Sequence, residues 1–97
     1  MKRWIHASSN VANRFRYVIY NYDLEYNEEL DALKSFPGTR KEAAIKFAEK
    51  YAKEHANEGL GAHVVIIPDD EDDEEVLEYF EYSLGGVEPY ETIWTSY

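Results

Sequence analysis

The segment that most constrains the fold is Thr39 to His55, an amphipathic stretch with helical periodicity. At 100° per residue its small and apolar side chains fall on one stripe, and its lysines lie opposite. The Thr39–Glu42 spacing fits a capping box at the start, and Gly59 or Gly61 is expected to end the helix in a left-handed conformation. We therefore predict one long helix over residues 40–57 that packs on a sheet. The stripe consists of Ala44, Ile45, Ala48, Tyr51, Ala52 and His55, with Phe47 at its edge.

Strand patterns lie on both sides of this helix. Residues 14–22 combine aromatic and β-branched side chains, and their alternation predicts that Phe15, Tyr17 and Ile19 face the core. Residues 28–35 are predicted to form a short helix capped by Asn27, with Leu30, Leu33 and Phe36 directed inward. The predicted strands are residues 3–8, 14–22, 62–67, 77–84 and 90–96.

Residues 76–84 fit two patterns. As a helix, capped by Asp72, they would place Val76, Leu77, Phe80 and Leu84 on one stripe. As a strand, they would alternate aromatic and polar side chains. We predict the strand, because residues 85–89 make a plausible hairpin loop before the next strand, and the helix remains the alternative.

These elements predict an α+β fold in a single small domain, residues 1–97. An antiparallel-dominated sheet of about five strands, in the order ββ-α-α-βββ, would be covered on one face by the long helix. The 97 residues are 44% hydrophobic, which is enough for a packed core. The absence of cysteine excludes disulfides and thiol chemistry.

Charge is distributed very unevenly along the chain. Residues 1–53 carry all ten lysines and arginines against seven acids, a balance of +3, whereas residues 54–97 carry thirteen acids and no base. The longest acidic run, Asp69 to Glu75, is expected to be a solvated loop or the junction between a loop and the next element. A surface of this sign repels nucleic acid and anionic membranes and attracts basic proteins.

Catalytic and metal-binding patterns are weak. The three histidines, His6, His55 and His63, lack ligand spacing, and the acidic run lacks the alternating ligands and central glycine of a calcium loop. There is no glycine-rich phosphate loop and no glycine elbow around a serine. We therefore predict no metal, no cofactor and no enzymatic activity.

In size, charge and lack of catalytic motifs, the chain resembles the small acidic proteins that phages and mobile elements use to block nucleic-acid-binding enzymes, including DNA mimics and anti-CRISPR proteins. The resemblance implies a non-catalytic inhibitor that occupies a basic groove of a nucleic-acid-binding protein, without binding nucleic acid or membrane itself. Because the N-terminus shows no signal peptide, a cytoplasmic location is expected. The predicted partner-binding residues are Asp69, Asp70, Glu71, Asp72, Asp73, Glu74, Glu75, Glu78, Glu81, Tyr82 and Trp94.

Two other hypotheses remain. An adaptor or homo-oligomeric interaction protein would use exposed tyrosine and tryptophan on the sheet, with Tyr82 and Trp94 as candidates. A small enzyme using glutamate or histidine has the least support. Salt separates the first two classes, because binding through carboxylates weakens steeply with ionic strength and an aromatic interface does not.

Overall fold

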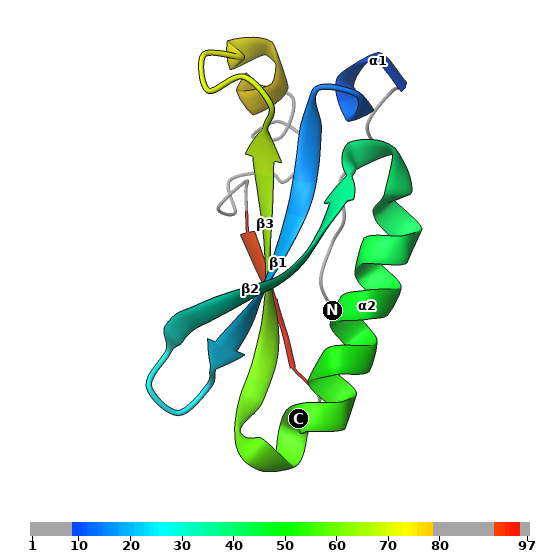
Figure 1. The fold of residues 1–97 in the computed structure, drawn as a ribbon. Coiled ribbons are helices and arrows are strands. Elements are labelled where there is room, and N and C mark those ends of the chain that lie inside the picture. Colours follow the sequence, from blue (N-terminus) through cyan, green and yellow to red (C-terminus); the bar gives the residue numbers. More distant parts are fainter. Residues whose placement is uncertain (1–8, 79–90, 96–97) are drawn as a thin grey trace.

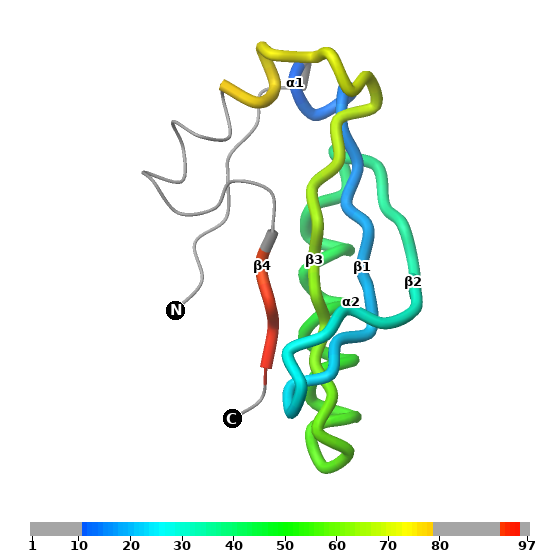
Figure 2. The backbone as a smooth tube through the Cα atoms, turned by 90° about the vertical axis from the view of Figure 1, so that its left-hand side faces the viewer, coloured from blue at the N-terminus to red at the C-terminus, as the bar shows by residue number. Residues whose placement is uncertain are grey.

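The computed structural model describes residues 9–78 and 91–95, and within them the fold is α+β (Figure 1). Four strands form one antiparallel sheet in the order β2-β1-β3-β4. One long helix covers one face of this sheet, and in Figure 2 it lies behind the strands. The elements are α1 (Ser9–Ala12), β1 (Phe15–Asp23), β2 (Glu28–Pro37), the 3-10 turn η1 (Gly38–Arg40), α2 (Lys41–His55), the 3-10 turn η2 (Ala56–Glu58), β3 (Leu60–Pro68) and β4 (Glu91–Trp94).

The centre of the sheet is the regular pairing of β1 with β3. Their register runs without a shift from Phe15 opposite Pro68 to Asp23 opposite Leu60. As predicted from the alternation, Phe15, Tyr17 and Ile19 are buried in the main core. Fully burying a side chain of this size contributes about 1.5–3 kcal/mol, so these strands are the main source of stability.

The predicted long helix is confirmed as α2. Its buried side chains are Ala44, Ala48 and Ala52, spaced by four residues on the face toward the sheet. Their small size lets the helix backbone approach the strands closely, while Ile45 is only partly buried. Gly59 ends this region in a left-handed conformation with φ 74°, as expected.

The predicted capping box at the start of α2 is wrong. Residues Gly38–Arg40 form a 3-10 turn, so the residue at the N-cap position is Arg40 and not Thr39. No side chain caps the helix there. The turn is fixed by close packing at Gly38, where an added Cβ would lie 2.2 Å from the carbonyl oxygen of Ala12.

Residues 28–35, predicted to be a helix, belong to strand β2. The turn before it is held by Asp23, whose Oδ1 accepts from the amides of Glu25 at 2.9 Å and Tyr26 at 3.2 Å. Two register shifts, between Ile19 and Tyr20 and between Tyr20 and Tyr22, interrupt the pairing of β1 with β2. Both shifts add a residue on the β2 side, so this strand can accommodate apolar side chains at a three-residue spacing that resembles a helix pattern.

The C-terminal predictions have a mixed outcome. Strand β4, Glu91–Trp94, confirms the core of the strand predicted at 90–96. The start of the strand predicted at 77–84 is wrong, because residues 74–78 are helical. Residues 79–84, like the strand predicted at 3–8, lie outside the described residues. No helix in the described part of the chain is long and apolar enough to cross a membrane.

The α2 packing generates a stability prediction. Ala48→Asp should lower the free energy of unfolding by about 2–5 kcal/mol, because a carboxylate would be buried against the sheet. The exposed position Lys46 provides the control: Lys46→Asp should cost about 1 kcal/mol or less. Urea unfolding followed by circular dichroism measures both. Equal effects of the two substitutions would contradict the packing described here.

Candidate functional site

The acidic run begins where β3 ends and lies at the same end of the sheet as α1 (Figure 1). The amide of Asp69 donates to the carbonyl oxygen of Arg14 at 2.8 Å, which ties the run to the start of β1. We call the acids at this end the acidic surface. It comprises Asp69, Asp70, Glu71, Asp72, Asp73, Glu74, Glu75 and Glu78.

The run forms the junction between β3 and the helical residues 74–78, one of the two forms predicted from its composition, and its backbone is folded into a turn. Asp70 Oδ1 accepts from the amide of Asp72 at 3.0 Å, and the Asp70 carbonyl accepts from the amide of Asp73 at 3.0 Å. Aspartate favours such turns because its short side chain reaches the backbone two residues further on. The backbone under the carboxylates is therefore held in one conformation.

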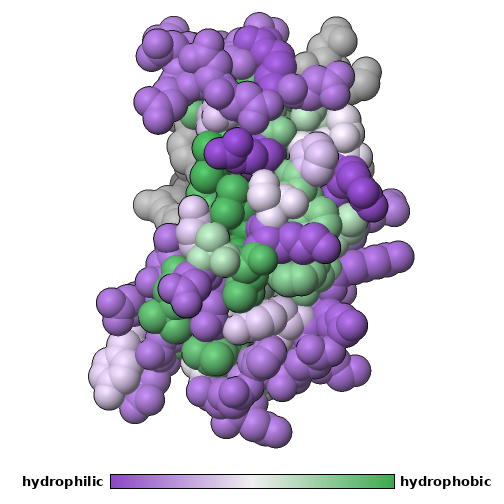
Figure 3. Space-filling view, viewed as in Figure 1, coloured by the Kyte–Doolittle hydropathy of each residue, from purple (hydrophilic) through white to green (hydrophobic). Residues whose placement is uncertain are grey.

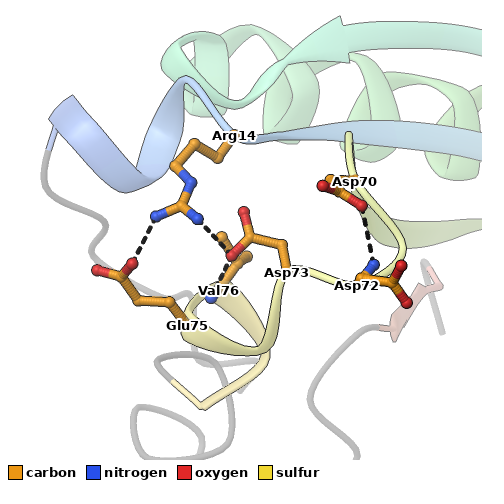
Figure 4. A network of polar contacts seen from close by, with 6 residues as sticks. All are labelled: Arg14, Asp70, Asp72, Asp73, Glu75 and Val76. Atoms are coloured by element: carbon orange, nitrogen blue, oxygen red, sulfur yellow. Dashed lines mark hydrogen bonds and ion pairs between the residues drawn. The ribbon is translucent and has the colours of Figure 1, made fainter.

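Asp73 is the buried member of the acidic surface, with a side chain only 5% exposed. Its Oδ1 accepts from the amide of Val76 at 3.4 Å, the position of a side-chain cap on a helix N-terminus (Figure 4). Val76 is itself fully buried. The cap predicted at Asp72 is therefore Asp73, because only Asp73 is directed toward the start of the helical residues 74–78.

Arg14 provides the positive charge that makes this burial possible. Its Nη2 lies 2.5 Å from Asp73 Oδ1, and its Nη1 lies 2.7 Å from Glu75 Oε2, so the guanidinium bridges two acids of the run (Figure 4). The hydrogen bond to Glu75 and the charges of both acids raise the pKa of Arg14, against the opposing effect of desolvation. The bridge keeps the guanidinium charged and fixes the helical segment to β1.

Two acids of the run are thus engaged by Arg14, and the others face solvent. Asp69, Asp70, Glu71, Asp72 and Glu74 are exposed, as is Glu78. Within residues 9–78 and 91–95, no ion pair engages any of these six carboxylates. They are the part of the acidic surface that is available to a partner.

Of the remaining predicted partner-binding residues, the structure describes only Trp94, which does not lie at this end. Trp94 is half-buried, packs against the main core and lies opposite Ala62 in the sheet. Ala62 is six residues before Pro68 on β3, which places Trp94 roughly 20 Å from the acidic run along the strand direction. Glu81 and Tyr82 lie outside the described residues.

The two described histidines lie in two other places, and His6 lies outside the described residues. His63 is buried on β3, with Nδ1 3.0 Å from Glu29 Oε2 and its ring beside those of Tyr20 and Tyr22. This contact ties β2 to β3 across β1. Among the described residues, no group of three or more His, Asp or Glu side chains is placed to hold a metal ion.

The second histidine, His55, ends an aromatic row on α2. Its ring stacks on Tyr51 at 4.2 Å, and its Nδ1 lies 2.5 Å from Glu58 Oε2. Desolvation, with a smaller effect from the charge of Glu58, raises the pKa of Tyr51. At the other end of α2, desolvation lowers the pKa of Lys41. These contacts stabilise the helix ends and bring no nucleophile next to a base.

Comparisons with protein-family models, curated proteins and solved structures found no match for this chain. The exposed part of the acidic surface consists of six carboxylates that form no ion pair within the described residues, on a backbone held by Arg14 and by the Asp70 turn.

The geometry of the acidic surface predicts different effects on stability for substitutions of its buried and its exposed residues. Asp73→Ala should lower the free energy of unfolding by about 0.5–2 kcal/mol from loss of the cap alone. Asp72→Ala, which removes an exposed carboxylate, should change it by about 0.5 kcal/mol or less. Asp73→Asn, which retains a capping oxygen but not the charge, should fall between them. Denaturant titration measures all three, and identical stabilities for Asp72→Ala and Asp73→Ala would exclude the capping role.

Proposed function

We propose that this protein is a non-catalytic inhibitor that binds a basic, nucleic-acid-binding groove of another protein through its acidic surface. The observation that carries the proposal is the order of that surface. Carboxylates that serve only solubility need no fixed arrangement, and crowding them raises the free energy of the compact state. Here the Arg14 bridge and the Asp70 turn hold them together.

The density of charge supports the comparison with a phosphate backbone. Residues 69–78 contain eight acids. If the chain advances by a distance per residue between the rise of a helix and that of a strand, these residues carry roughly one charge per 2–4 Å. A DNA duplex carries one charge per about 1.7 Å.

A second candidate is the adaptor or homo-oligomer, and one observation favours it. Tyr26 and Leu30, in and beside the turn between β1 and β2, are 72% and 38% exposed. Large exposed apolar side chains on an edge strand suit a protein interface. In this case the interface would be formed by the hairpin, at the opposite end of the sheet from the acidic surface (Figure 1).

The proposal predicts that binding depends on the free carboxylates. Changing Asp69, Asp72 and Glu74 to lysine should abolish capture of basic proteins from a lysate at about 0.05 M salt, because the charge of the eight-residue acidic surface falls from −8 to −2 while the bonds of Arg14 and Asp70 are retained. The captured wild-type partner should release labelled duplex DNA when more inhibitor is added, without turnover. The inhibitor alone should not shift that DNA in a gel.

The matched control is on α2. Lys46, Lys50 and Lys53 changed together to glutamine should leave capture and DNA release nearly unchanged, because they lie on the exposed helix face. The adaptor hypothesis gives the opposite ranking. Tyr26→Ser with Leu30→Ser would weaken binding, and the lysine substitutions at Asp69, Asp72 and Glu74 would not. Tight binding of nucleic acid by the isolated protein would rule out the mimic.

A further inference from the structure

An apolar hollow lies directly beside the acidic surface. It has a volume of about 290 Å³. Figure 3 shows hydrophobic side chains immediately below the hydrophilic end of the molecule that contains the acidic run. The described lining residues are Val65, Ile66, Ile67, Pro68, Glu71 and Leu77.

The hollow is built from two elements that meet at a corner. Val65 and Ile67 alternate along β3 with the more deeply buried Ile66, so they face away from α2. Leu77 comes from the helical residues 74–78, which Asp73 and Arg14 fix against the end of the sheet. The same contacts that order the acidic surface therefore also form one wall of the hollow.

Its lining combines hydrocarbon with one carboxylate. Val65, Ile67 and Leu77 are partly buried and leave apolar surface accessible, while Glu71 is exposed at the rim. Lysine and arginine side chains have this same dual character, because their methylene stems pack on apolar surface while the charged head stays at the edge. A purely aliphatic side chain would make no use of Glu71.

From this geometry, and resting on the proposed function, we infer that the hollow is the specific contact for one arginine or lysine side chain of the basic partner. The stem lies against Val65, Ile67 and Leu77, and the cationic head pairs with Glu71. The carboxylates of the acidic surface attract the basic segment around it. Leu77 thus contributes apolar binding energy, and Glu71 contributes electrostatic binding energy.

Charge complementarity selects this occupant over a second copy of the chain. Two copies with a net charge of −10 each repel one another, particularly at their acidic ends. A cation already lies on this face of the sheet: Arg16 is exposed and lies opposite Ile67 in the pairing of β1 with β3. Arg16 is not among the lining residues, so it should repel the incoming side chain without filling the hollow.

The test uses the full chain and defined peptides. The probe is a nine-residue Gly/Ser peptide with lysine at each end and arginine at the centre. Matched peptides carry citrulline, which keeps the shape without the charge, or glycine at the centre. Methyl and amide NMR titrations report the dissociation constant and the site, with the methyl signals of Val65, Ile67 and Leu77 as the readout.

We expect the arginine peptide to shift those methyl signals and to bind about tenfold more tightly than the glycine peptide. Glu71→Gln should reduce the advantage of the arginine peptide over the citrulline peptide. Leu77→Ser should weaken arginine binding about tenfold while leaving its salt dependence unchanged. Val65→Thr keeps the side-chain shape, and should weaken binding in the same direction if Leu77→Ser proves unstable. Arg16→Gln should strengthen binding.

Each failure has a separate meaning. Equal affinity of the arginine and glycine peptides, with shifts confined to the amides of the acidic surface, would overturn the hollow and leave the proposed function standing. The proposed function would be overturned if the peptides shifted neither the methyl signals of the hollow nor the amide signals of the acidic surface, and if the variant with lysine at Asp69, Asp72 and Glu74 captured the partner as well as the wild type. Concentration-dependent dimerisation that disappears when Lys46, Lys50 and Lys53 become glutamine would assign the hollow to a second copy, and would also overturn the inference.

Discussion

The helical residues 74–78 that follow β3 are held against the sheet by one buried carboxylate, Asp73, and by the guanidinium of Arg14 that faces it. A buried carboxylate without a partner is strongly destabilising, so this pairing decides whether the helical segment after β3 can form. The same guanidinium holds Glu75, and the same carboxylate caps the amide of Val76. Buried Val76 then closes the core at that end. Charge compensation at one point therefore allows the other acids of the run to stay exposed in fixed positions.

Much of the fold follows from local periodicity, which the sequence displays directly. The alanine stripe of α2 and the alternation in β1 are properties of single elements, and both predictions were confirmed. Strand β2 could not be found this way. Leu30, Leu33 and Phe36 have a helix-like spacing in the sequence, and the irregular pairing with β1 that accommodates this spacing exists only once the hairpin has formed. Tertiary context here overrides the local preference.

The candidate site was likewise predictable only in the part that a local sequence pattern reveals. The sequence predicts where the acids lie, because composition alone identifies residues 69–75, but it assigns them all to solvent. The missing partner, Arg14, is 59 residues from Asp73 and 61 from Glu75, and no local pattern connects them. The excess of bases in residues 1–53 was the one available signal. It indicated that positive charge was present without showing which residue supplies it, and the hollow behind Leu77 left no sequence pattern at all.

Attraction between opposite charges and contact in an apolar hollow have different ranges, and a small acidic protein benefits from having both at one end. Charge acts over a screening length of about 8 Å at physiological salt, so it raises the rate of encounter but discriminates poorly among basic partners. An apolar hollow acts only on contact and is insensitive to salt, so it slows dissociation of a partner whose side chain fits. Because the Arg14–Asp73 pair positions the helical segment that carries both Leu77 and the neighbouring acids, loss of that pair would weaken both contributions together. Under the proposed function, attraction and selectivity would therefore both depend on the Arg14–Asp73 pair.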